Sequence, residues 1–144
     1  MYHFRNDYSV GAHTAVLEAV CVTNGDAFPG YGADELCQRA ADLIRAAADA
    51  PGADVQFLVG GTQTNFTAIC AFLRPWEGVI APVSGHINGH EAGAVEGTGH
   101  KVIPVQTAED GKLCPELLRP VLAEYAHDHM VLARMVYISQ ATES

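Results

Sequence analysis

The sequence has 144 residues, enough for one domain with a single hydrophobic core but too few for a second domain of any size. Apolar residues make up 49% of the chain and charged residues 17%, a balance that excludes wholesale disorder. Eight Lys and Arg residues stand against 17 Asp and Glu residues, and the net charge of −9 argues against nucleic-acid phosphates or anionic lipid as partners. We therefore expect a globular protein that binds a small molecule.

The cysteines and the N-terminal segment indicate the cellular compartment. Four widely spaced cysteines form no CxxC pair and no zinc-type spacing with histidine, so we expect buried thiols in a reducing compartment (Cys21, Cys37, Cys70 and Cys114). The first residues, MYHFRNDYSVGAH, lack the apolar core of a signal peptide, and no apolar stretch approaches the ~18 residues of a membrane span. These features favour a cytoplasmic location.

Residues 33–50 are the first segment whose apolar residues recur at helical spacing, which predicts a helix. Leu36, Leu43 and Ile44 share one face of it with several alanines. The Pro51-Gly52 pair ends this helix. The next segment, VQFLVG at 55–60, is rich in strand formers and predicts a strand. A glycine turn then leads into a helix over FTAICAFL.

The alternation continues to the end of the sequence. Three further strands are predicted at 78–83, 101–105 and 135–139, with a helical segment after the first of them and a helix over 115–129 before the last. Pro115 suits the first turn of that helix. Because the strands are apolar throughout rather than alternating, both faces of the sheet should be covered by helices, which predicts a mainly parallel α/β fold in three layers.

This layout is incomplete for an α/β domain. The last predicted strand, 135–139, is followed only by QATES, whereas later segments usually complete the ligand site at the carboxyl ends of the strands. We therefore expect residues 1–144 to be an N-terminal arm and the first part of a larger domain, with the rest of that domain and a C-terminal domain absent.

The glycine turn at GGTQTN is the sharpest candidate site. The start of a helix exposes unpaired N–H groups and partial positive charge, and glycines let a phosphate approach the backbone closely. Thr62 and Thr64 add hydroxyl donors. The segment lacks the P-loop and GxGxxG patterns, which disfavours a nucleotide. The alternative is an ordinary strand-to-helix turn with Thr62 as the N-cap.

A second candidate is SGHINGHEAGAVEGTGH at 84–100, which gathers histidines and carboxylates in a glycine-rich stretch. His86, His90 and His100 are the side chains on which a metal-binding domain would depend. HINGHE is not the HExxH motif, however, and its glycines weaken the helix that such a site needs. Solvated loop histidines, or one catalytic or ring-stacking histidine, remain as alternatives.

Taken together, these segments resemble the N-terminal portion of the threonine aldolase group of β-eliminating lyases. These are pyridoxal-phosphate (PLP) enzymes with the aspartate-aminotransferase fold, known as fold type I. The resemblance rests on the order and spacing of six motifs that span the chain, namely FRNDYSVGAH, GYGADE, FLVGGTQTN, GHINGHEAGAVEGTGHKV, DGKLCPELL and MVYISQATES.

The resemblance assigns roles to particular residues. Gly61 and Thr62 resemble the phosphate-binding turn of the family, and His86 resembles the histidine that stacks on the pyridine ring and takes part in catalysis. Glu91 matches a glutamate that follows this histidine and either orients it or caps a helix. No metal is implied.

Two further residues correspond to substrate-binding positions. Asn6 lies where the family has a serine that contacts the substrate carboxylate, and its amide is expected to donate the same hydrogen bond. Tyr31 lies in a Tyr-Gly-x-Asp loop near an active site across a subunit interface. The lysines present, Lys101 and Lys112, do not match the lysine that forms the Schiff base, so we expect this chain alone to be inactive.

The implied reaction is retro-aldol cleavage of threonine or a related β-hydroxy amino acid to glycine and an aldehyde. The implied assembly of the intact enzyme is a homodimer or homotetramer. Another PLP-dependent reaction, β-elimination or transamination, is the first alternative, and a metal-binding domain built on His86, His90 and His100 is the second.

Overall fold

The computed structural model describes residues 10–140. The chain divides into two compact units, one up to Phe57 and the other from Leu58 onward. Among the described residues, none of the helices has the length and apolar character that a membrane span requires.

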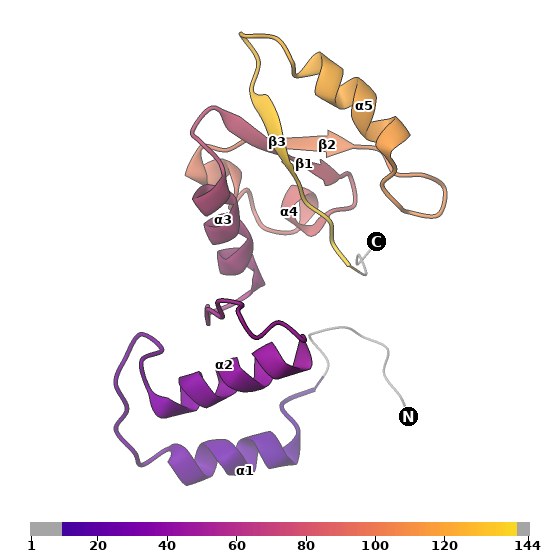
Figure 1. The fold of residues 1–144 in the computed structure, drawn as a ribbon. Helices are drawn as coiled ribbons and strands as arrows, with labels where there is room; N and C mark the ends of the chain where they lie inside the picture. Colours follow the sequence, from indigo (N-terminus) through magenta and orange to yellow (C-terminus); the bar gives the residue numbers. More distant parts are fainter. Residues whose placement is uncertain (1–9, 141–144) are drawn as a thin grey trace. The chain divides into compact units, whose positions relative to one another are not determined.

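The described part of the first unit contains the helices α1 (Thr14–Thr23) and α2 (Glu35–Ala47) (Figure 1). Helix α2 confirms the prediction for 33–50 but ends sooner, and it begins at the N-cap Asp34, which accepts a hydrogen bond from the Cys37 N–H at 2.8 Å. Helix α1 was not predicted. Its sequence, TAVLEAVCVT, is apolar on most sides and rich in β-branched residues, so no helical face stands out, and none of its residues is buried.

The second unit is built on a parallel sheet of strands β1 (Glu77–Pro82), β2 (Val102–Val105) and β3 (Leu132–Val136), in the order β2-β1-β3. Every residue of the central strand β1 is buried. The parallel α/β fold is thereby confirmed. Strand β3 begins three residues before the predicted 135–139, since the Leu132 N–H already donates to the Trp76 carbonyl.

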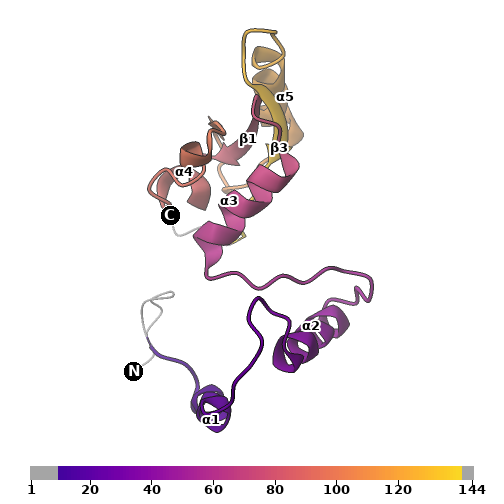
Figure 2. The same cartoon turned by 90° about the vertical axis from the view of Figure 1, so that its left-hand side faces the viewer.

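Helices cover both faces of this sheet. Helices α3 (Gly61–Phe72) and α4 (His86–Gly89) lie on one face, and α5 (Pro115–Glu124) lies on the other (Figure 2). The first face is sealed by a cluster that includes Ile69 and Ile87, and the second by a cluster into which Leu117, Leu118 and Val121 of α5 pack. This confirms the predicted three layers and fixes α3 and α4 side by side.

The predicted strand at 55–60 is wrong. These residues are not part of any strand in the described chain, and the side chains of Phe57, Leu58 and Val59 are exposed. The apolar pattern favours a buried strand, but a strand also needs a hydrogen-bonded neighbour, and the three-stranded sheet provides none for this segment.

Two smaller expectations also need correction. Helix α5 ends at Glu124 and not at 129, because the Tyr125 N–H closes the last turn on the Val121 carbonyl and the following AHDH offers no apolar side chain to the sheet. The cysteines are not buried: two are exposed and two are half-buried, and none forms a disulfide in the described chain (Cys21, Cys70, Cys37 and Cys114).

Candidate active site

Strand β1 ends at Pro82, and a tight turn delivers the chain into α4 at His86. Gly85 is required in this turn, because a Cβ there would lie 2.9 Å from the Pro82 carbonyl oxygen. The backbone N–H of His86 donates to the Ser139 hydroxyl at 2.9 Å, just beyond β3. His86 is thus held at the carboxyl ends of two adjacent parallel strands, where ligand sites of such sheets occur.

The His86 side chain contacts a buried carboxylate. Its Nδ1 lies 2.8 Å from Oε1 of Glu91, whose side chain is fully buried (0% exposed), while the imidazole itself is 36% exposed. Asn65 of α3 donates from Nδ2 to the same Oε1 at 2.6 Å. The Oε2 atom of Glu91 is buried and has no hydrogen-bond partner within the described part of the chain. Glu91 therefore joins α3 to α4.

This geometry favours one of the two roles considered for Glu91. Its carboxylate contacts the imidazole and not the backbone N–H groups at a helix start, so it can orient the ring. An ionised carboxylate only accepts hydrogen bonds, so when Glu91 is ionised Nδ1 of His86 donates to it, and a neutral ring in that tautomer can accept a proton at Nε2.

The start of α3 forms a second polar region on the same face of the sheet. Gly60 is the N-cap, with φ of 179°, so Thr62 is not the cap and lies inside the first turn. Within residues 10–140, the N–H groups of residues 61–63 have no hydrogen-bond partner, and a Cβ built on Gly61 meets nothing within 4 Å. Thr64 differs from the prediction, because its hydroxyl donates to the Gly60 carbonyl at 2.9 Å.

Asn65 links these two regions. It lies four residues beyond Gly61 and therefore on the same side of α3 one turn later, where it bonds Glu91 and through it His86. The turn and the imidazole predicted from separate motifs thus lie on one face of the sheet.

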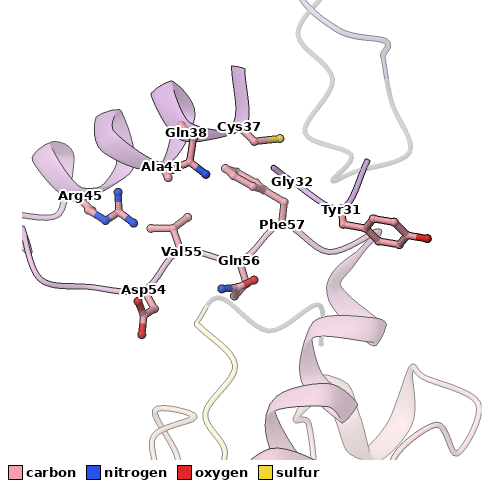
Figure 3. A pocket seen from close by; sticks show the side chains of 10 residues that line it. All are labelled: Tyr31, Gly32, Cys37, Gln38, Ala41, Arg45, Asp54, Val55, Gln56 and Phe57. Carbon is pink, nitrogen blue, oxygen red and sulfur yellow. The ribbon is translucent and has the colours of Figure 1, made fainter. Parts of the chain in front are cut away.

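The two predicted substrate residues are not part of the second unit. Asn6 is outside the described residues. Tyr31 belongs to the first unit, where its backbone has a positive φ of 65° and its side chain is fully exposed. It borders a cavity of about 600 Å³ together with Arg45 and Phe57. Its phenol points away from the other lining side chains (Figure 3).

The three histidines of the metal alternative do not converge. His100 is buried, and its Nδ1 lies 3.0 Å from the Glu77 carbonyl oxygen of β1. The rings of His86 and His90 have centroids 5.7 Å apart and are tilted by 38°. No group of three or more potential metal ligands occurs among the residues that the structure describes. His100 instead secures the start of β1.

Sequence reasoning missed three residues of the site, namely Asn65, Tyr137 and Ser139. The Tyr137 hydroxyl lies 3.4 Å from both Asn65 Nδ2 and Ser139 Oγ. Tyr137 and Ser139 could have been found together, because residues two apart along an extended segment face the same side, and both follow the predicted strand pattern. For Asn65 the signal was its place in the first turns of a helix that follows a glycine turn.

The two lysines interact with side chains outside the candidate site, although Lys112 lines a cavity together with Ser139. Lys101 Nζ lies 5.6 Å from the centre of the Tyr125 ring, which packs on the α5 face of the sheet. Lys112 forms an ion pair with Asp110 at 2.6 Å.

Comparison with known proteins identifies the family. The sequence profile of the beta-eliminating lyase family matches residues 4–144. The chain belongs to the beta-eliminating lyase family. Among relatives in this family are the low specificity L-threonine aldolases of Pseudomonas aeruginosa, 30% identical over 97% of this chain, and of Pseudomonas sp., 33% identical over 78%.

A solved family structure matches the fold. The Leishmania major threonine aldolase is 48% identical, and its structure superposes with a TM-score of 0.91 over 99% of this chain. The chain covers 42% of that structure, and 40% and 33% of the two Pseudomonas proteins. The partial parallel sheet with flanking helices therefore corresponds to the N-terminal portion of a threonine aldolase.

Proposed function

We propose that this chain is the N-terminal part of a PLP-dependent lyase that cleaves L-threonine or a related β-hydroxy amino acid to glycine and an aldehyde. The observation that carries the proposal is the Asn65–Glu91–His86 network beside the start of α3. It occurs in a family member whose relatives are named threonine aldolases.

The residues present fit the cofactor. An anion such as the PLP phosphate needs converging N–H donors and room for close approach, and the first turn of α3 provides both at Gly61 and Thr62. An aromatic cofactor ring needs a flat partner, and the half-exposed imidazole of His86 is such a partner. Gly61, Thr62 and His86 are thus the cofactor-binding residues of this proposal.

When bound, PLP supplies an electron sink for the pair released as the Cα–Cβ bond of the substrate breaks. The protein has to fix the substrate and remove the proton of its β-hydroxyl. His86 is the proposed base, taking this proton on Nε2 while Nδ1 stays hydrogen-bonded to Glu91. Glu91 stabilises the charged imidazole that results.

Substrate recognition and assembly complete the proposal. Asn6 donates from its amide to the substrate carboxylate, and Tyr31 lies near an active site of a neighbouring subunit in a homodimer or homotetramer. An exposed tyrosine held at a positive φ in a glycine-flanked loop suits such a role, because it contributes little to packing in its own unit.

The Schiff-base lysine lies outside residues 1–144 in this proposal. Lys112 is paired with Asp110, and Lys101 lies near a ring on the α5 face, away from His86. Borohydride reduction of the 144-residue chain after addition of PLP should leave no stoichiometric adduct on either lysine. A reduced adduct mapped to one of them would contradict this assignment.

The decisive experiment uses the whole protein that contains this chain. With L-threonine it should release glycine and acetaldehyde in equal amounts, whereas keto acid and ammonia would instead indicate β-elimination.

His86→Phe keeps a flat ring but removes the base, so we expect cofactor binding to persist while turnover falls by about 10²-fold or more. His90→Phe is the matched control and should retain activity. Full turnover in His86→Phe would rule out the base.

A further inference from the structure

The two oxygens of Glu91 have very different surroundings. Oε1 lies 2.6 Å from Asn65 Nδ2 and 2.8 Å from His86 Nδ1. Oε2 is buried and has no hydrogen-bond partner in the part of the chain that the structure describes. A buried negative charge is costly unless hydrogen bonds compensate it. The ionised form of Glu91 therefore depends on the hydrogen bonds that reach Oε1.

Glu91 and His86 can hold their protons in two ways. Either Glu91 is ionised and Nδ1 of the ring donates to it, or Glu91 is protonated and donates to Nδ1, which places the ring hydrogen on Nε2. Only the first arrangement leaves the lone pair on Nε2 once the ring is neutral. The choice between them decides which nitrogen of His86 acts as a base.

Asn65 favours the first arrangement. Its amide N–H approaches Oε1 as a donor, and a donor stabilises a carboxylate but opposes a hydrogen on the same oxygen. The amide is held from the other side, since Nδ2 also lies 3.4 Å from the Tyr137 hydroxyl. Its backbone is fixed in α3, whose Ile69 is buried against the sheet.

We propose that Asn65 is a positioning residue that sets the tautomer of His86 through Glu91, so that Nε2 carries the lone pair. Its importance for catalysis rests on the proposed function, in which Nε2 receives the β-hydroxyl proton. The tautomer itself can be measured without cofactor or substrate.

The test is ¹⁵N NMR of the histidine rings in the 144-residue chain, without cofactor, over a series from about pH 5 to about pH 9. In the unmutated chain, Nε2 of His86 should take the shift of a nitrogen with a lone pair as the ring becomes neutral. Asn65→Leu has a side chain of similar size but no donor. In this variant the lone-pair shift should move to Nδ1 in the lower part of the series, reversing the order of the two signals.

His100 is an internal control for folding. Its Nδ1 faces a backbone carbonyl, which only accepts hydrogen bonds, so this ring should keep its hydrogen on Nδ1 in every folded variant. Thr67→Leu introduces the same side chain at an exposed position of α3 and should leave His86 unchanged. If Asn65→Leu loses the His100 signal, Asn65→Met provides a more adaptable side chain that also lacks a donor.

Two outcomes would overturn the proposal. One is an unmutated chain in which His86 becomes neutral with its hydrogen on Nε2. The other is a folded Asn65→Leu or Asn65→Met chain in which His86 keeps its hydrogen on Nδ1 throughout. Neither result depends on aldolase turnover, so failure of this inference and failure of the proposed reaction can be told apart.

Discussion

His86 and Ser139 are 53 residues apart in the sequence, yet the backbone N–H of His86 donates to the Ser139 hydroxyl at 2.9 Å. This bond satisfies an N–H group at the start of α4, which has no side-chain cap of its own. It also joins the segment after β1 to the segment after β3. The position of the imidazole is therefore set by the sheet as well as by the loop that carries it.

Removing this acceptor should loosen the start of α4. We expect Ser139→Ala to cost about 1 kcal/mol locally, so the His86 amide should exchange with solvent roughly fivefold faster. Hydrogen exchange followed by NMR measures this directly. Ser84→Ala is the matched control, because its hydroxyl forms no hydrogen bond in the described chain. Equal exchange of the His86 amide in both variants would show that Ser139 does not hold the turn.

The central strand should not tolerate a side chain at Gly78. A Cβ there would lie 2.8 Å from the Lys101 carbonyl oxygen and 2.8 Å from Val131 Cγ1. Because backbone is involved, β1 and β2 would have to move apart, and we expect Gly78→Ala to lower the free energy of unfolding by about 1–3 kcal/mol. Urea unfolding measures this.

Gly89→Ala is the comparison for Gly78→Ala. Gly89 ends α4, and a Cβ there meets nothing within 4 Å. This substitution should leave the midpoint of unfolding unchanged or slightly higher, since alanine favours helix more than glycine does. A similar loss of stability in both variants would show that the close contacts at Gly78 are not the cause of the destabilisation in Gly78→Ala.

A substitution at Gly61 distinguishes a structural role of this residue from a role in binding the PLP phosphate. Since a Cβ at this position meets nothing in the chain, Gly61→Ala should not lower the unfolding temperature. If the turn holds the PLP phosphate, the added methyl group should still weaken cofactor binding, by about tenfold for a cost of about 1.4 kcal/mol. Spectrophotometric titration of the whole protein with PLP measures the affinity. Unchanged affinity would move the phosphate site away from this turn.

Features whose signal lies within a short stretch of sequence could be predicted, whereas features that depend on distant segments could not. The apolar runs at 78–83 and 101–105 predicted β1 and β2 because burial on both faces is visible in the sequence itself. The same signal at 55–60 failed, because pairing depends on a neighbouring strand that the apolar pattern does not specify. Helix α1 has no polar face, so periodicity gave no sign of it.

The candidate site shows the same division. The sequence itself predicts His86, Glu91 and the GGTQTN turn as site residues, because each lies in a short motif. Asn65 and Ser139 contact this group across 26 and 53 residues, and only the packing of α3 and β3 around β1 brings them there. Residue type alone does not distinguish them from other surface Asn and Ser side chains.

In the first unit, Asp34 and Cys37 influence each other's ionisation. Hydrogen bonds from the Cys37 side chain and its backbone N–H lower the pKa of the Asp34 carboxyl, and the same side-chain bond raises the pKa of the Cys37 thiol. Because the folded-state pKa of Asp34 is depressed, the ionised carboxyl stabilises α2 at pH values above its unfolded pKa. This contribution is lost as pH falls through the folded value.

The raised pKa of Cys37 predicts slow alkylation, because the thiolate is the reactive form. Asp34→Asn keeps an efficient N-cap for α2 but removes the negative charge, so the thiol pKa should fall toward its ordinary value. We expect iodoacetamide to label Cys37 faster in this variant at mildly alkaline pH, with the site of labelling assigned by mass spectrometry. The exposed Cys70 in the other unit should react at the same rate in both chains. If Cys37 were labelled no faster in Asp34→Asn while circular dichroism showed α2 intact, the Asp34 carboxylate would not be what suppresses its thiolate.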